Sequence, residues 1–228
     1  LVKATEGDVH NKSQVREDAE LIEKGYRDSG YLNARVQPKV TLDREAKTTH
    51  VVHDVYEGDL KYIREITITG NTVTRDEVIR QRVILEPGDR FDGTSARASQ
   101  SAVESTGYFD TIQLVPDDVE GDDRFTDLLV DVEEGKTGSI QFGAGYSTEE
   151  KFGGYVEITK NNFDILNWPT FEGGGQQLRI KVSSGDVSDE YSLSYTHPQF
   201  MGYPFALGID LFNESRSYTG GIDYSEEL

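Results

Sequence analysis

Five consecutive segments in residues 138–211 alternate between apolar and polar side chains, and this alternation limits most strongly how the chain can fold. In the first segment, Ile140, Phe142 and Tyr146 are separated by small or polar residues. Because successive side chains of a β-strand point to opposite faces, each segment predicts a strand with one apolar face. The other four segments, and the expected start of a sixth, fall within 154–159, 177–183, 191–196, 205–211 and 218–224.

Two architectures alternate in this way, a transmembrane β-barrel and a soluble antiparallel sandwich. Charges on the polar face, such as Glu157 and Lys181, fit both. The connections favour the barrel, because 148–151 and 184–188 contain no aromatic residue whereas the alternate connections contain several. Aromatic residues gathered at one end of a strand array are typical of the girdle at a membrane surface. The predicted interfacial aromatics are Phe163, Trp168, Phe171, Phe200 and Tyr203.

The composition of the 228 residues argues against several classes of protein. Acidic residues number 42 against 23 basic ones, a formal charge of −19, which argues against nucleic acid as a partner. No apolar run approaches the roughly 18 residues of a membrane-spanning helix. The chain has no cysteine, and its four histidines form no spaced set of metal ligands. It also lacks a nucleophile elbow and a phosphate-binding glycine motif, so we predict no enzyme, no catalytic residue, no cofactor and no metal site.

Residues 1–135 contain an internal repeat, seen in three landmarks that recur in the same order. Two of them are offset by 77 residues and the third by 81. The pairs are Gly30-Tyr31 with Gly107-Tyr108, Asp54–Gly58 with Asp131–Gly135, and Gly7-Asp8 with Gly88-Asp89. We therefore expect two copies of one domain in this region.

The second copy predicts the element order β-α-α-β-β. Its first helix begins with a capping-box spacing at Thr74 and Glu77, and its apolar positions extend that helix towards Pro87. The acidic segment 117–123 could bind calcium, but its spacing matches no known calcium loop and an acidic hairpin turn is favoured. The other predicted elements are a strand over 62–69, a helix over 92–106 and strands near 111–115 and 126–133.

The first copy predicts a helix over 12–29, because Val15, Ala19, Ile22 and Tyr26 form one apolar stripe at helical spacing. It also predicts strands near 34–42 and 50–56. It has no counterpart of the opening strand and of most of the first helix of the second copy. We therefore expect the first domain to be truncated at its N-terminus.

Motifs in both regions resemble one known family. The segment 63–71 (IREITITGN), the helix end Gly107-Tyr108-Phe109 and the closing segment 131–135 resemble a POTRA domain, the periplasmic module of BamA-type outer-membrane assembly factors. The segments that follow resemble the start of that family's barrel. They are the first strand at 138–147, the turn motif formed by 161–163 with 173–176, and the turn Thr196–Phe200.

This resemblance implies an α+β fold of POTRA repeats followed by an incomplete antiparallel transmembrane β-barrel. The expected domains are a truncated POTRA domain at 1–58, a complete one at 59–136, and five to six barrel strands at 137–228. Besides the incomplete barrel, the chain departs from the family in an insertion over Asp164–Glu172 between the second and third barrel strands. This turn is expected on the periplasmic side, where barrel turns are short.

The resemblance also implies a function, that of an outer-membrane protein assembly factor with its POTRA domains in the periplasm of a Gram-negative-type bacterium. The implied partners are unfolded outer-membrane protein clients, accessory assembly lipoproteins and outer-membrane lipid. Two alternatives stay open: a secreting or translocating barrel of the same superfamily, of the two-partner secretion or TamA-like type, and a soluble binding module with a sandwich fold.

Two sets of site residues follow from the resemblance. The strand after the second POTRA helix is expected at a sheet edge, where it could pair with a client peptide or simply be solvated; its counterpart in the first copy is 34–42. The first barrel strand is expected to form the barrel seam, where its glycines either weaken the strand or accommodate curvature. The docking residues are Asp110, Thr111, Ile112, Gln113, Leu114 and Val115, and the seam residues are Ile140, Phe142, Gly143, Gly145 and Tyr146.

Overall fold

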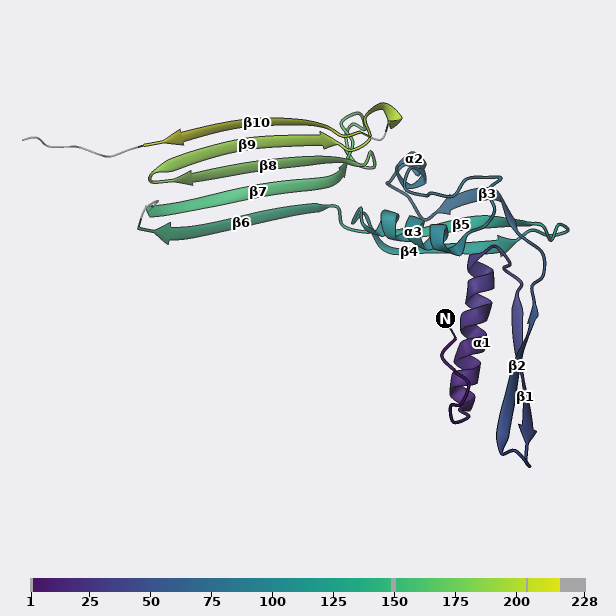
Figure 1. Cartoon of the computed structure of the whole chain (residues 1–228). Coiled ribbons are helices and arrows are strands. Elements are labelled where there is room, and N and C mark those ends of the chain that lie inside the picture. Colours follow the sequence, from purple (N-terminus) through teal and green to yellow (C-terminus); the bar gives the residue numbers. More distant parts are fainter. Residues whose placement is uncertain (1, 149–150, 204, 218–228) are drawn as a thin grey trace, which may run out of the picture. The chain divides into compact units, whose positions relative to one another are not determined.

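The computed structural model describes residues 2–148, 151–203 and 205–217 and contains two compact units (Figure 1). The first unit comprises Leu1–Asn71 and Ile79–Glu133, and the second comprises Thr72–Val78 and Glu134–Leu228. The sixth strand expected at 218–224 lies outside the described residues. No helix in the described part of the chain is both long and apolar enough to cross a bilayer.

The second repeat copy folds in the predicted order β-α-α-β-β. Its elements are β3 (Tyr62–Thr69), α2 (Asp76–Arg80), α3 (Gly93–Glu104), β4 (Phe109–Asp118) and β5 (Phe125–Glu134). The three strands form one sheet in the order β3-β5-β4, with β3 parallel to β5. Alternate residues of the central strand β5 point inward, so Leu128 and Val130 are fully buried with Ile63 and Val103. Burial of this apolar cluster stabilises the domain.

The first helix of this copy is shorter than the sequence predicts. The helix α2 ends at Arg80, and the following turn is held by hydrogen bonds from Arg82 N to Ile79 O and from Val83 N to Arg80 O. The amide of Ile84 then donates to the Ser99 hydroxyl of α3 at 2.9 Å. A tertiary hydrogen bond thus replaces the continuing helical ladder, and Val83 is buried without being helical.

The first copy contributes α1 (Lys12–Asp28) and an antiparallel hairpin of β1 (Arg35–Asp43) and β2 (Thr48–Tyr56). The predicted apolar stripe of α1 is turned inward, with Val15 and Ala19 buried. Equivalent glycines of the two copies share a left-handed backbone. Their φ values are +94° at Gly7 and Gly88, +96° at Gly30 and +67° at Gly107. Two of the three repeated landmarks are therefore repeated turns, at which glycine avoids the cost that a Cβ would add.

The second unit is built on a five-stranded antiparallel sheet in the order β10-β9-β8-β7-β6 (Figure 1). Each alternating segment of the sequence is one of these strands. They are β6 (Gly138–Ser147), β7 (Lys151–Phe163), β8 (Gln176–Gly185), β9 (Ser188–His197) and β10 (Leu207–Arg216). The predicted fold class, POTRA-type α+β repeats followed by antiparallel barrel strands that do not close, is confirmed.

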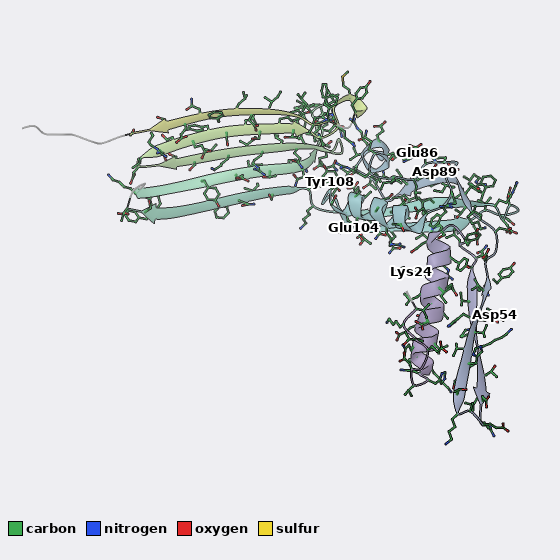
Figure 2. The ribbon with its side chains drawn as sticks, in the orientation of Figure 1. Lys24, Asp54, Glu86, Asp89, Glu104 and Tyr108 are labelled. Atoms are coloured by element: carbon green, nitrogen blue, oxygen red, sulfur yellow. The ribbon has the colours of Figure 1, made fainter. Side chains whose placement is uncertain are left out.

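The strand register collects the apolar side chains on one face of this sheet. Phe142 lies opposite Val156, which lies opposite Val182, which in turn lies opposite Tyr191. The neighbouring row on the other face is polar and consists of Gln141, Glu157, Lys181 and Ser192. Side chains project from both faces of the sheet in Figure 2. The sheet is therefore amphipathic across the four strands β6 to β9 that these rows cross.

Candidate functional sites: a sheet edge, a seam strand and a braced turn

The strand β4 lies at an edge of its sheet, because the sheet order is β3-β5-β4. Its apolar side chains Ile112 and Leu114 pack against the core, whereas Thr111, Gln113 and Val115 are exposed. All six residues predicted for client docking, Asp110–Val115, therefore lie on an edge strand that its own core holds in place. An edge strand is the part of a sheet that can accept a further extended peptide.

The helix α3 reaches one polar group of this strand. The side-chain amide of Gln100 donates to the Ile112 carbonyl at 3.1 Å and to the Glu104 carboxylate at 2.9 Å; Glu104 is labelled in Figure 2. The strand is thus tied to the helix by both apolar packing and a hydrogen bond. In the first copy, the predicted edge over 34–42 coincides with β1, whose sheet partner among the described residues is β2.

The strand β6 lies at one edge of the five-stranded sheet, and its apolar residues Ile140, Phe142 and Tyr146 are exposed. Its two central glycines differ. A Cβ at Gly143 would lie 2.7 Å from Cε1 of Tyr155, whereas a Cβ at Gly145 would meet nothing within 4 Å. Gly143 therefore leaves room for an aromatic ring across the strand pair, whereas the space beside Gly145 is open.

Phe163, one of the predicted interfacial aromatics, is the last residue of β7, and the other four lie in the turns that join β7 to β8 and β9 to β10. Because consecutive antiparallel strands reverse direction, both turns lie at the end of the sheet where β6 begins. Phe171 stacks on Phe163 at 5.8 Å between ring centroids and meets Trp168 edge-on at 5.2 Å. In the other turn, Phe200 and Tyr203 both contact Phe205. The structure thus brings the aromatics together within each turn.

The base of the turn between β7 and β8 contains a buried polar network that the sequence did not predict. Asn162 and Asp164 are buried. The side-chain amide of Asn162 donates to the Thr74 hydroxyl at 2.7 Å, and its Oδ1 accepts from the Gly175 amide at 2.9 Å. Asp164 forms an ion pair with Arg75 and accepts a hydrogen bond from the Leu166 amide at 3.0 Å. The hydrogen bonds satisfy the amide of Asn162, and the ion pair with Arg75 offsets the cost of burying the Asp164 carboxylate.

The segment 72–78 therefore packs against this turn within the second unit. Thr74 also donates from its amide and its hydroxyl to the Glu134 carboxylate, at 2.7 and 3.0 Å. Thr74, which the sequence placed in a capping box with Glu77, thus bonds to two residues far away in the sequence. A spacing signal could not reveal this network, since Thr74 and Asn162 are 88 residues apart.

No metal site is formed by the residues that the structure describes, in which no three His, Cys, Asp or Glu side chains cluster suitably. The acidic segment after β4 is a turn between two strands, as favoured from the sequence. Arg124 donates from its amide and its guanidinium to Asp122, at 3.1 to 3.2 Å. This bonding lowers the pKa of the Asp122 carboxyl, chiefly through the side chain of Arg124.

The sequence is similar to known assembly factors. The POTRA family, described as the surface antigen variable number repeat, matches residues 1–58 and 61–135. The chain is 27% identical over 187 residues to the outer membrane protein assembly factor BamA of Neisseria meningitidis serogroup B, covering 82% of this chain and 22% of that protein. It is 25% identical over 217 residues to BamA of Neorickettsia risticii, covering 95% and 28%. The chain thus spans about a quarter of the length of these relatives.

The fold is similar to solved structures. The crystal structure of BamA from Haemophilus ducreyi lacking POTRA domains 1–3 matches 96% of this chain and 40% of that chain, with a TM-score of 0.82 and 27% identity. The POTRA3–5 structure of BamA from Haemophilus influenzae matches 56% of this chain and 50% of that chain, with a TM-score of 0.50 and 23% identity. The resemblance expected from the sequence motifs is confirmed.

Proposed function

The chain belongs to the POTRA family of surface antigen repeats, and we propose that it acts within an outer-membrane protein assembly factor. Two features support this proposal: the order of POTRA repeats followed by barrel strands, and the similarity of nearly the whole chain to a BamA structure. The domains we propose are a POTRA domain at 1–58, a second at 59–136 and barrel strands at 137–228. The protein would lie in the outer membrane of a Gram-negative-type bacterium, with the POTRA domains in the periplasm.

The observation that carries the proposal is the edge position of β4. Its core-facing residues Ile112 and Leu114 fix the strand, while its edge can pair with an extended segment of an unfolded barrel protein. Such pairing depends on main-chain groups, so it suits clients of many sequences. We propose Asp110–Val115 as the docking strand, and accessory lipoproteins and outer-membrane lipid as further partners. No step of this function requires a catalytic residue.

The strand β6 is the proposed seam of the barrel. It too lies at a sheet edge, and it presents apolar side chains on one face. In this proposal, the edge pairs with the last strand of the closed barrel and is released to pair with a client strand. The ring of Tyr155 packs over Gly143 and would keep β6 attached to β7 while the free edge of β6 exchanges partners.

Docking at β4 can be tested by photocrosslinking to an unfolded outer-membrane barrel protein kept in urea and then diluted. A photoreactive residue replaces Gln113 on the edge strand or, as a control, Asp131 on the exposed side of the central strand β5. We expect crosslinks from position 113 and few from position 131, because only the edge can accept a new strand. Equal crosslinking at both positions, or none at 113, would contradict docking at this edge.

The assembly function itself is tested in phospholipid vesicles. Vesicles that contain the protein should speed the conversion of the same client to a protease-resistant, membrane-inserted form, relative to empty vesicles. If the client instead crossed into the vesicle lumen, the protein would be a translocating relative.

A further inference from the structure

The insertion between β7 and β8 holds apolar side chains out into solvent. Ile165 is 55% exposed, Leu166 81% and Trp168 78%. In a chain with 29% charged residues, the seven residues 165–171 include no charge. The two acidic residues that flank them are paired, Asp164 with Arg75 and Glu172 with Lys160. The insertion therefore presents an apolar surface whose charges are neutralised at its base.

The insertion is internally bonded. The Phe171 amide donates to the Asn167 carbonyl at 2.6 Å, and the Asp164 amide donates to the Phe171 carbonyl at 3.0 Å. The side chain of Asn167 donates to the Glu172 carbonyl at 2.8 Å. Backbone groups bonded in this way can approach a lipid phase at lower cost than free ones. The apolar side chains are thus displayed by a closed turn.

The exposed residues continue the apolar face of the sheet. Tyr195 lies on that face, opposite Leu178 and Ile209. Its ring meets Phe163 edge-on at 6.4 Å, Phe163 stacks on Phe171 at 5.8 Å, and Phe171 meets Trp168 at 5.2 Å. An unbroken row of rings therefore leads from the sheet face to the exposed indole of Trp168.

We propose that the insertion 164–172 is an interfacial anchor, which places Ile165, Leu166 and Trp168 among the phospholipid headgroups of the periplasmic leaflet. This inference rests on the proposed function, since it takes the apolar face of the sheet as the lipid-facing surface. The occupant is lipid because the surface continues that face, is uncharged, and ends in tryptophan, whose amphipathic ring favours the headgroup level. The Arg75–Asp164 ion pair holds the base of the anchor.

The single tryptophan of the chain makes this anchor directly observable. The whole chain is reconstituted into vesicles of phosphatidylethanolamine and phosphatidylglycerol whose acyl chains are brominated either near the headgroup or near the methyl end. We expect the Trp168 emission to shift to the blue, to lose quenching by aqueous acrylamide, and to be quenched more by the shallow bromines than by the deep ones. This measurement needs no substitution.

A second probe separates failure of the anchor from failure of the barrel assignment. Since the chain has no cysteine, Ile158→Cys places a single fluorescent label on the apolar face of β7. If lipid bromines quench the label but acrylamide still quenches Trp168, the anchor alone is overturned. The insertion would then be a surface for a protein partner. Absence of lipid quenching at both sites would overturn the membrane-facing assignment of the sheet, and the anchor with it.

A matched pair of variants tests which side chains enter the lipid. Leu166→Asp places a charge on the exposed apolar surface, and Thr170→Asp places the same charge at an exposed polar position of the same turn. We expect Leu166→Asp to restore acrylamide quenching of Trp168 and Thr170→Asp to leave it low. Unchanged quenching in Leu166→Asp would contradict the proposal.

Discussion

Gly173 is held where its backbone and its surroundings both exclude a side chain. Its φ is +95°, and a Cβ would lie 2.1 Å from the carbonyl oxygen of Val73. Asn162, across the same turn, also has a positive φ and uses both ends of its amide. The turn motif recognised in the sequence is therefore explained by a close contact between the turn and the segment 72–78, and the left-handed glycine alone does not account for it.

We predict that Gly173→Ala destabilises the fold much more than Gly202→Ala. Both glycines have a positive φ, so both variants carry the backbone strain of about 1 kcal/mol. Only Gly173 has a close neighbour; a Cβ at Gly202 meets nothing within 4 Å. We expect Gly173→Ala to lower the free energy of unfolding by more than about 3 kcal/mol. Denaturant unfolding of both variants measures this. Equal losses in the two variants would mean that the contact with Val73 does not constrain the turn.

Most elements could be predicted from the sequence, because their causes are local. The stripe at Val15 and Ala19 predicted α1, and alternation predicted the five strands of the second sheet. The length of α2 could not be predicted, because the amide of Ile84 bonds to Ser99 of another helix. The edge position of Asp110–Val115 came from the family resemblance, whereas the network around Asn162 depends on residues far apart in the sequence.

The helix α3 is capped by Asp92, whose carboxylate accepts from the amides of Thr94 at 2.8 Å and Ser95 at 3.4 Å. Burial raises the pKa of this carboxyl, but the hydrogen bonds from Thr94 and Ser95 outweigh burial, so the pKa is lowered overall. A group whose pKa is lower in the folded state stabilises the fold at a pH above its unfolded value, about 3.9 for aspartate.

We predict that Asp92→Ala lowers the free energy of unfolding by about 1 kcal/mol at neutral pH, and that Asp92→Asn lowers it less because asparagine also caps helices. The difference between wild type and Asp92→Asn should vanish as the pH falls through the folded pKa, since the carboxylate is then protonated. Denaturant unfolding at pH 7 and near pH 3 checks both expectations. A pH-independent difference would show that the charge of Asp92 is not involved.

At the scale of the whole chain, one sequence follows two different rules for burying apolar residues. The α+β repeats bury Ile63, Leu128 and Val130 in a closed core. The five-stranded sheet leaves Phe142 and Ile209 exposed on one face. An exposed apolar face of this extent indicates a surface that is covered in the working protein, and we propose that lipid is the covering phase.

This assignment predicts that the two faces of β8 respond oppositely to charge. Ile180 lies on the apolar face, between Ile158 and Leu193, whereas Ser183 lies on the polar face opposite Glu190. In vesicles, Ile180→Arg should destabilise the folded protein by about 2–4 kcal/mol, the cost of arginine on a lipid-facing position near the bilayer midplane. Ser183→Arg should have little effect, because this position lies on the polar face, where charged side chains such as Lys181 and Glu190 are already accommodated. Urea unfolding in phospholipid vesicles measures the stability of both variants. If the apolar face were instead covered by protein, as in a sandwich, the loss of stability in Ile180→Arg would not depend on the thickness of the bilayer.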